Sequence, residues 1–165
     1  MKYIGIDPGK TGSLAIIDIV KDIGNGMGAK GLSLFPVPIF NDDYDMRGMY
    51  NLLASNKDNS FAVIERATAM PGQGTVSMFS FGRGYGLWLM ALTVSEIPFQ
   101  IVHSRVWTKT MLVGSVGEGK ERGASVARNL FPQWQPKLKK ELQYCDSILL
   151  AEYARRLKEG GINAK

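Results

Sequence analysis

Near its N-terminus the chain reads Ile4-Gly5-Ile6-Asp7-Pro8-Gly9, a short apolar run that ends in a carboxylate and a Pro-Gly turn. The apolar stretch Thr11-Gly12-Ser13-Leu14-Ala15-Ile16-Ile17 follows, so the pattern predicts a strand, a tight turn and an antiparallel return strand. Asp7 then lies at the end of a buried strand, where an ionised side chain is costly unless a cation pairs with it.

A second segment repeats this arrangement further along the chain. Phe61-Ala62-Val63-Ile64-Glu65 is another apolar run closed by an acid. If the two strands are neighbours, Asp7 and Glu65 lie side by side and repel each other unless a divalent cation lies between them. A third acid, Asp146, begins an apolar helical stretch, and it completes the group if that helix packs across the sheet near the strand ends. The pattern therefore predicts a metal site built from three carboxylates.

The type of donor indicates which metal and which chemistry to expect. Carboxylate oxygens suit Mg²⁺ or Mn²⁺, whereas zinc would recruit Cys or His. Two such ions held about 4 Å apart can activate a water molecule and stabilise the leaving oxygen in phosphodiester hydrolysis. We expect a structural or surface role for the single histidine, His103, because metal-bound water needs no protein base.

Length, composition and charge narrow the class of protein. A chain of 165 residues that is 45% hydrophobic is typical of a single globular domain, residues 1–165, with a core of its own. The net charge of +5 and the pI of about 9.4 suit a polyanionic substrate held beside an acidic pocket. The single cysteine, Cys145, excludes an internal disulfide, and the sequence has neither a membrane-spanning run nor a signal-peptide pattern. We therefore expect a cytoplasmic protein without membrane contact.

Hydrophobic periodicity predicts an α/β fold with a mixed sheet, because three strands precede the first helix and strands then alternate with helices. The third strand ends in prolines and is expected near a sheet edge. Glycine-rich loops are expected at residues 21–30 and 114–119. The expected strands span residues 4–7, 11–17, 32–37, 61–65 and 99–102. The expected helices span residues 45–54, 76–95, 104–112, 120–130 and 143–158.

With these motifs in this order, the chain resembles the RuvC-like Holliday-junction resolvases of the RNase H fold, especially the short bacteriophage and poxvirus-type members. The resemblance implies a five-stranded mixed sheet flanked by helices, and a homodimer that cuts four-way and other branched DNA by paired symmetric nicks. It also implies a crossover junction endodeoxyribonuclease of DNA recombination and repair, which uses two Mg²⁺ ions per site, accepts Mn²⁺, and leaves 5′-phosphate and 3′-hydroxyl ends. If the protein is phage-encoded, its compartment is the host cytoplasm. The matching segments are Ile4–Gly12, Val63–Glu65, Phe79–Gly86, Trp107–Lys109 and Asp146–Tyr153.

Asp7, Glu65 and Asp146 match the first, second and last acids of the family. Bacterial RuvC has two acids three residues apart at the start of its final helix, whereas this chain has the neutral Gln143 three residues before Asp146. The nearest acid, Glu141, is five residues away, which is about 500° of helix and so about 140° from Asp146. If the helix begins after Glu141 and the chain is extended there, we expect Glu141 as the fourth ligand. An alternative role for Asp146 is that of a helix N-cap.

Two lysines, Lys109 and Lys120, resemble basic residues that approach the scissile phosphate in the family, and solvated surface lysines are an equal alternative. Lys120 opens a predicted helix, where a cation opposes the helix dipole, so a phosphate or an acid nearby is indicated. A basic cluster just before the last helix would lie beside the metal site and could grip backbone phosphate.

The segment after Glu65 suits contact with an opened junction. Its loop, residues 67–75, can insert there with Met70 or Phe79 as a wedge against an unstacked base, and a plain connecting loop is the alternative. In the helix that follows, Gly82 and Gly86 are four residues apart, and the resemblance favours a dimer contact there over tight packing on the protein's own sheet. The expected DNA-binding residues are Met70, Gln73, Phe79, Arg83, Lys137, Lys139 and Lys140.

Three other classes of protein stay open from the sequence. The hairpin around Asp7 also matches the first phosphate-binding hairpin of actin-like and sugar-kinase ATPases, but those proteins close two related lobes over the nucleotide and this chain supplies one. Gln143 keeps open a non-catalytic protein of the same fold that binds branched DNA. An RNase H-type nuclease that acts on hybrids is the nearest enzymatic alternative.

Overall fold

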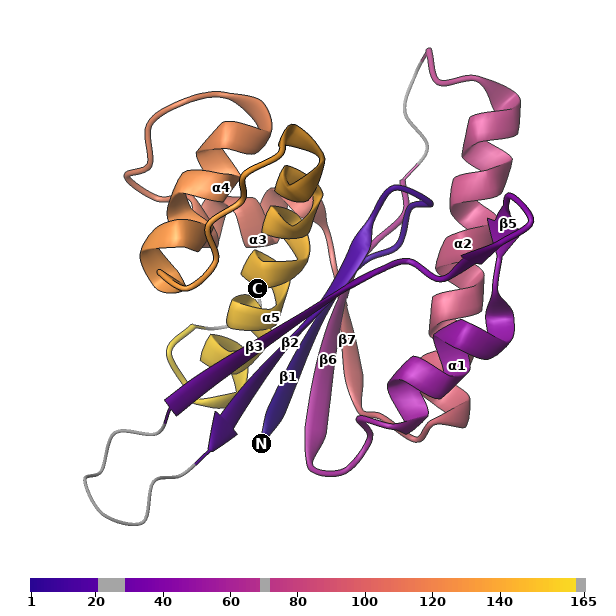
Figure 1. The fold of residues 1–165 in the computed structure, drawn as a ribbon, viewed down its shortest axis with the longest axis horizontal. Coiled ribbons are helices and arrows are strands. Elements are labelled where there is room, and N and C mark those ends of the chain that lie inside the picture. The colour runs from indigo at the N-terminus through magenta and orange to yellow at the C-terminus, as the bar shows by residue number, and fades with distance from the viewer. Residues whose placement is uncertain (21–28, 69–71, 163–165) are drawn as a thin grey trace.

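The computed structural model describes residues 1–20, 29–68 and 72–162, and a five-stranded mixed sheet lies at its centre (Figure 1). The strand order is β3-β2-β1-β6-β7, with antiparallel pairs β1–β2 and β2–β3 and parallel pairs β1–β6 and β6–β7. The α/β class, the mixed sheet of five strands and the edge position of β3 are confirmed. The strands are β1 (Lys2–Asp7), β2 (Ser13–Val20), β3 (Ala29–Pro36), β6 (Ser60–Glu65) and β7 (Phe99–Val102).

Helices cover both faces of the sheet. One face carries α1 and α2, and the other carries α3, α4 and α5 (Figure 1). All five predicted helices are confirmed, and each bound lies within one residue of the expected one. No helix of the described residues is both long and apolar enough to cross a membrane. The helices are α1 (Met46–Ala54), α2 (Thr75–Val94), α3 (Ser104–Met111), α4 (Gly119–Leu130) and α5 (Tyr144–Lys158).

The side chains of β1 alternate between the two helical layers, as the two-residue period of a strand requires. Tyr3 belongs to the hydrophobic cluster that contains α3, α4 and α5, whereas Ile4 and Ile6 belong to the cluster under α1 and α2. Asp7 is four residues after Tyr3 and therefore points to the same face of the sheet, which α5 covers.

The close packing of α5 on β1 depends on Gly5. A Cβ atom at Gly5 would lie 2.2 Å from Ser147 O and 2.3 Å from Ala151 N, both in the backbone of α5. Because Gly5 has no side chain, the helix backbone lies directly against the strand. The hydroxyl oxygens of Ser13 and Ser147 are 2.7 Å apart and join the start of β2 to the same turn of α5.

Three short elements were not predicted. A hairpin made of β4 (Ile39–Phe40) and β5 (Asp43–Tyr44) turns at Asn41 and Asp42, whose φ angles are 49° and 58°. Both residue types tolerate this left-handed region, which a two-residue hairpin turn requires. The third element is a 3-10 turn, η1 (Lys139–Gln143), directly before α5.

The glycines of α2 differ in what surrounds them. A Cβ atom at Gly84 would lie 2.3 Å from the ring of Tyr44, so this glycine lets the β4–β5 hairpin pack on the helix. Gly82 and Gly86 have no described atom within 4 Å of a Cβ position. Tight packing within the chain therefore occurs at Gly84, whereas the glycine pair predicted for a dimer contact faces outward.

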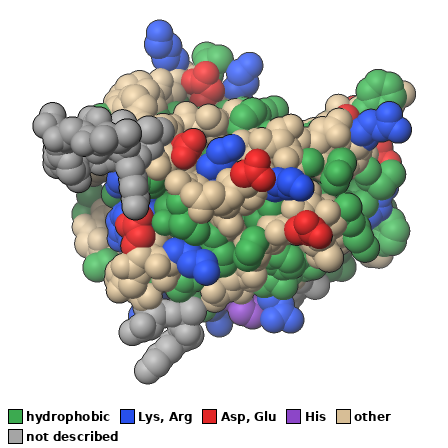
Figure 2. All heavy atoms as spheres, turned by 90° about the horizontal axis from the view of Figure 1, so that it is seen from below, with side chains coloured by type: hydrophobic (Ala, Val, Ile, Leu, Met, Phe, Trp, Pro, Cys, Tyr) green, Lys and Arg blue, Asp and Glu red, His purple; other side chains and the backbone are tan. Residues whose placement is uncertain are grey.

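The two ends of the sheet differ in their side chains. Figure 2 shows the end at which β1 begins, where acidic and basic side chains lie intermixed with apolar ones. Asp7 and Glu65 close their strands at the opposite end. The two strand-end acids therefore lie at the end of the sheet that Figure 2 does not face.

The substitution Gly5→Ala is expected to destabilise the protein strongly, because the new methyl group would collide with helix backbone rather than with a movable side chain. Overpacking costs about 1–3 kcal/mol, and we expect a loss at the upper end of that range or above it, measured by urea unfolding. Gly31→Ala in β3 is the matched control, since its Cβ would meet only Asp18, at 3.7 and 3.8 Å. Equal stability of the two variants would contradict the role of Gly5.

Candidate active site

Two acids end neighbouring parallel strands. Asp7 is the last residue of β1 and Glu65 is the last residue of β6, and the register pairs Ile6 with Ile64 directly before them. Val63 packs in the same layer as α5, so Glu65, two residues further on, shares the face on which Asp7 lies. The structure therefore brings the two strand-end carboxylates side by side, as the sequence predicted.

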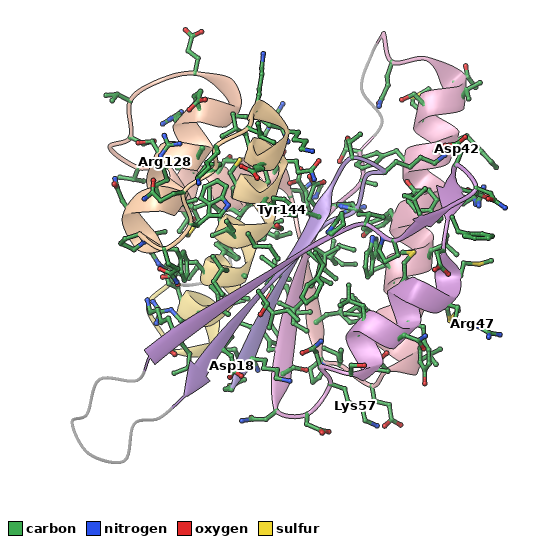
Figure 3. The ribbon with its side chains drawn as sticks, in the orientation of Figure 1. Asp18, Asp42, Arg47, Lys57, Arg128 and Tyr144 are labelled. Atoms are coloured by element: carbon green, nitrogen blue, oxygen red, sulfur yellow. The ribbon has the colours of Figure 1, made fainter. Side chains whose placement is uncertain are left out.

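The third acid reaches the same place from α5. Asp146 lies in the first turn of this helix, and its side chain is 27% exposed. Tyr144, the first residue of α5, lies beside the ends of the strands (Figure 3). The N-cap position belongs to Gln143, so the alternative role of Asp146 as a helix cap is wrong.

Burial and mutual repulsion make the ionised forms of these acids costly. Burial, followed by the charge of Asp146, raises the pKa of Asp7 to about 6, and the charge of Lys120 opposes this shift. Burial raises the pKa of Glu65 to about 7; a hydrogen bond from Trp107 opposes the shift, and the charges of Asp7 and Asp146 add to it. The three acids therefore form one electrostatic group.

Side chains from α3 and α4 complete this group. Trp107 Nε1 donates a hydrogen bond to Glu65 Oε2 at 3.0 Å and so orients the carboxylate. Lys120 Nζ lies 3.4 Å from Asp146 Oδ2, which supplies the acid expected near this lysine. Partial burial acts to lower the pKa of Lys120, but the charges of Asp146 and Asp7 outweigh it and raise that pKa. Trp107 was not predicted as a site residue, and its place in a segment matching the family was the only signal.

The chemistry of the donor set fits a hard divalent cation. All three groups are carboxylates. Burial is the main cause of the raised pKa values of Asp7 and Glu65, and a cation between the groups would remove the repulsion that adds to it. Among the described residues, no three His, Cys, Asp or Glu side chains are close enough together to form a ready-made metal site. Binding of an ion by Asp7, Glu65 and Asp146 therefore requires these side chains to move toward it.

An open cleft of about 730 Å³ adjoins Asp7. It lies between the turn after β1 and the N-terminal end of α2, and its lining includes Lys10, Tyr44, Gln73 and Phe81. The side-chain oxygen of Gln73 is buried without a hydrogen-bond partner among the described residues. The cleft therefore offers charged, aromatic and amide groups to a ligand that reaches the acids.

The structure does not bring Glu141 to the acid group. The expected extended conformation is wrong, because Glu141 lies within the 3-10 turn η1. Its Oε2 atom accepts hydrogen bonds from the backbone amides of Lys137 and Leu138, at 2.6 and 2.9 Å, and these bonds hold the pKa of Glu141 below its usual value. Gln143, at the position expected for an acid, accepts a hydrogen bond from Ser13 through its backbone oxygen, at 3.2 Å.

The predicted DNA-contact residues near α2 are spread over two surfaces. Met70 lies outside the described residues. Gln73 lines the cleft beside Asp7, whereas Phe79 is 73% exposed on the outer side of α2. Arg83 is also on α2, where it forms an ion pair with Asp43 of the small hairpin.

The predicted basic residues lie at separate places, with Lys109 in one hollow and Lys137 and Lys139 in another. Lys109 is exposed on α3 and lines a hollow separate from the cleft at Asp7. His103 is exposed, and its Nε2 lies 3.2 Å from Arg66 Nη1, in agreement with the expected surface role. The exposed lysines that precede α5 are Lys137, Lys139 and Lys140.

The raised pKa values predict how stability depends on pH when chelator removes divalent metal. Asp7 and Glu65 bind protons more tightly in the folded chain than in the unfolded chain. Their favourable contribution to the free energy of unfolding is therefore complete at low pH and is lost as pH rises through about 6 for Asp7 and about 7 for Glu65. Asp7→Asn removes one of these charges and should raise the melting temperature at pH 8 by roughly 5 °C, and by much less at pH 4.5, where the folded carboxyl is protonated. A calorimetric gain of the same size at both pH values would contradict this origin.

Comparison with known proteins identifies a shared fold. No protein-family model matches the sequence, and no curated protein matches it. The structure of Thermus thermophilus RuvC is similar, with a TM-score of 0.64 and 19% identity over 97% of this chain and 97% of RuvC. T. thermophilus RuvC in complex with a Holliday junction substrate is similar too, with a TM-score of 0.64 and 16% identity over 98% of this chain and 96% of RuvC. The chain therefore has a RuvC-like fold over nearly its whole length.

Proposed function

We propose that the protein is a metal-dependent endodeoxyribonuclease that resolves Holliday junctions and other branched DNA by paired symmetric nicks. One observation carries the proposal: three carboxylates from β1, β6 and α5 lie within electrostatic reach of one another at one end of the sheet, in a fold shared with a RuvC that binds a Holliday junction. Proteins of one fold can differ in function, so the acids, and not the fold alone, support a nuclease.

Each residue of the acid group has a distinct part in this proposal. Asp7, Glu65 and Asp146 would hold two Mg²⁺ or Mn²⁺ ions, which supply an activated water and stabilise the leaving oxygen when bound. Trp107 keeps the Glu65 carboxylate turned toward the site through its 3.0 Å hydrogen bond. Lys120 balances the charge of Asp146, and its half-exposed side chain can also contact a phosphate that approaches the acids.

The distribution of charge supports a nucleic-acid substrate. Residues 104–143, which include α3, α4 and η1, contain eight Lys or Arg residues and three acids. The net charge of this segment, +5, equals the net charge of the whole chain. This basic segment contacts the acid group through Trp107 and Lys120. A polyanion drawn to it is therefore held next to the carboxylates, whereas the opposite end of the sheet carries mixed charges (Figure 2).

The outer face of α2 supports a homodimer. Phe79, Met90 and Val94 are 73%, 62% and 56% exposed, and Gly82 and Gly86 lie between them at the same helical spacing. These residues form an apolar stripe along the helix that only the charged Arg83 interrupts, and such exposed stripes are typical of protein interfaces. Two copies joined through α2 would present two acid groups to paired strands of a junction.

A non-catalytic protein that binds branched DNA is the second candidate. Two observations favour it: Gln143 replaces an acid that bacterial RuvC has, and no ready-made set of three ligands exists among the described residues. The two candidates differ in whether Mg²⁺ or Mn²⁺ leads to strand cleavage.

A synthetic mobile four-way DNA junction in Mg²⁺ is expected to receive paired nicks at symmetric positions, while a linear duplex of the same sequence stays intact. Asp7→Asn removes a ligand and should lower the cleavage rate at least about a hundredfold, because metal stabilisation of the transition state is worth several kcal/mol. Asp58→Asn, an exposed acid before β6, is the matched control and should cut at the normal rate. Denaturing gels of end-labelled strands measure both.

Other outcomes of the cleavage assay separate the alternatives. Junction binding without cleavage in either metal would favour the non-catalytic candidate. Cleavage of RNA–DNA hybrids in preference to junctions would favour an RNase H-type nuclease. If neither binding nor cleavage of junctions occurs, the proposal is wrong.

The dimer is tested by placing a charge on the apolar stripe. Met90→Glu should convert a dimer to a monomer in light scattering, because an ionised carboxylate buried in the interface would lack a partner. Val116→Glu is the matched control, since Val116 is 86% exposed in the segment between α3 and α4. A wild-type protein that is monomeric at micromolar concentration, alone and on junction DNA, would rule out this interface.

A further inference from the structure

A second hollow lies between α3, α4 and the segment that connects them. Its volume is about 390 Å³, and it shares no lining residue with the cleft at Asp7. Both helices contribute basic side chains to its lining, namely Arg105, Lys109 and Arg122.

The lining of this hollow contains three basic side chains and no acidic one. No carboxylate lines the hollow, and among the described residues none of the three forms an ion pair. In the same helix α4, by contrast, Lys120 pairs with Asp146 and Arg128 pairs with Glu121. Like charges around one hollow repel each other, and a bound anion relieves that repulsion. The arrangement therefore indicates an anion site.

Two hydrogen bonds hold the guanidinium group of Arg122 in place. Its Nε donates a hydrogen bond to Ser115 Oγ at 2.8 Å, and its Nη2 donates one to Leu112 O at 2.9 Å. Its Nη1 group makes no hydrogen bond to any described residue, so part of the guanidinium is available to a ligand. Arg105 and Lys109 are exposed and can close on the same anion. A pre-oriented guanidinium with flexible cations around it suits a phosphate group.

Helix geometry separates this hollow from the acid group. In α3, Trp107 faces the acids, whereas Lys109, two residues further on, lines the hollow. In α4 the same spacing separates Lys120, which pairs with Asp146, from Arg122. Two residues correspond to about 200° of α-helix, so each helix directs one side chain to the acids and another to the opposite side. An anion in the hollow is therefore distinct from a phosphate at the acids.

We propose that this hollow binds a backbone phosphodiester of the nucleic acid, at a position other than the bond that is cut. The inference rests on the proposed nuclease function, because it places the substrate across both α3 and α4. It changes the expected role of Lys109 from contact with the scissile phosphate to contact with a second phosphate. Phosphate contacts fix the position of a duplex and supply affinity without reading sequence, so the hollow acts as an anchor for one arm of the substrate.

The test compares the double variant Arg105→Gln, Lys109→Gln with the double variant Arg47→Gln, Lys57→Gln. The control removes the same residue types from exposed positions on α1 and before β6, away from α3 and α4 (Figure 3). Binding of a fluorescent four-way junction is followed by anisotropy in EDTA, where no strand is cut, over a series of NaCl concentrations. Loss of one phosphate contact should reduce the steepness of the plot of the logarithm of the association constant against the logarithm of the NaCl concentration by about 0.9. It should also lower the affinity for the junction roughly tenfold. The control should retain the wild-type slope, and melting temperatures verify that both variants fold.

Each result has a definite meaning. A shallower slope in the Arg105, Lys109 variant alone, together with a shift of the Arg122 Nε–H signal on adding junction DNA, supports the anchor. A wild-type protein that cuts junctions while both variants bind alike overturns the anchor and leaves the nuclease proposal intact. If inorganic pyrophosphate shifts the Arg122 signal but junction DNA does not, the hollow binds free phosphate and the anchor is overturned. If the wild-type protein binds no DNA at any salt concentration, the nuclease proposal fails, and the anchor fails with it.

Discussion

The absence of a side chain at Gly5 is the constraint on which the candidate site depends. The backbone of α5 lies where a Cβ of Gly5 would be, 2.2 Å from Ser147 O, and this contact fixes the helix against the central strand. Asp146 is one residue before Ser147, so the same contact brings its carboxylate within electrostatic reach of Asp7. A larger residue at this strand position would move α5 outward and separate the acids. A glycine with no functional group thus determines where the charges meet.

The helices α3 and α4 connect this acid group to a basic surface. Each carries one side chain that contacts an acid, Trp107 at Glu65 and Lys120 at Asp146, and each carries basic residues on its other side. The same two helices therefore contact the acids on one side and carry basic residues on the other. A polyanion attracted to the basic side is guided toward the acids without a change of fold, which reconciles a net charge of +5 with a site made of carboxylates.

Local patterns predicted the parts of the structure that depend on neighbouring residues. Apolar runs closed by acids located β1 and β6, and the parallel pairing of these strands then made Asp7 and Glu65 neighbours. Longer-range features escaped prediction. The Glu141 carboxylate is held away from the acid group because it accepts hydrogen bonds from the backbone amides directly before η1. Trp107 contacts Glu65 only because tertiary packing brings α3 beside β6. The glycine between two isoleucines was a signal of close approach, but nothing local identified α5 as the element that approaches.

The strength of the contacts around the acids bears on whether a metal can enter. Lys120 is 53% exposed, and an ion pair of this kind contributes only about 0–1 kcal/mol, so it is a weak competitor for Asp146. The partner of Glu65 is the neutral indole of Trp107, which orients the carboxylate without cancelling its charge. Burial keeps Asp7 and Glu65 costly as anions, and no described side chain neutralises both. The protein thus concentrates negative charge that its own cations balance only in part, and a divalent ion of high charge density is the ligand best suited to balance the rest.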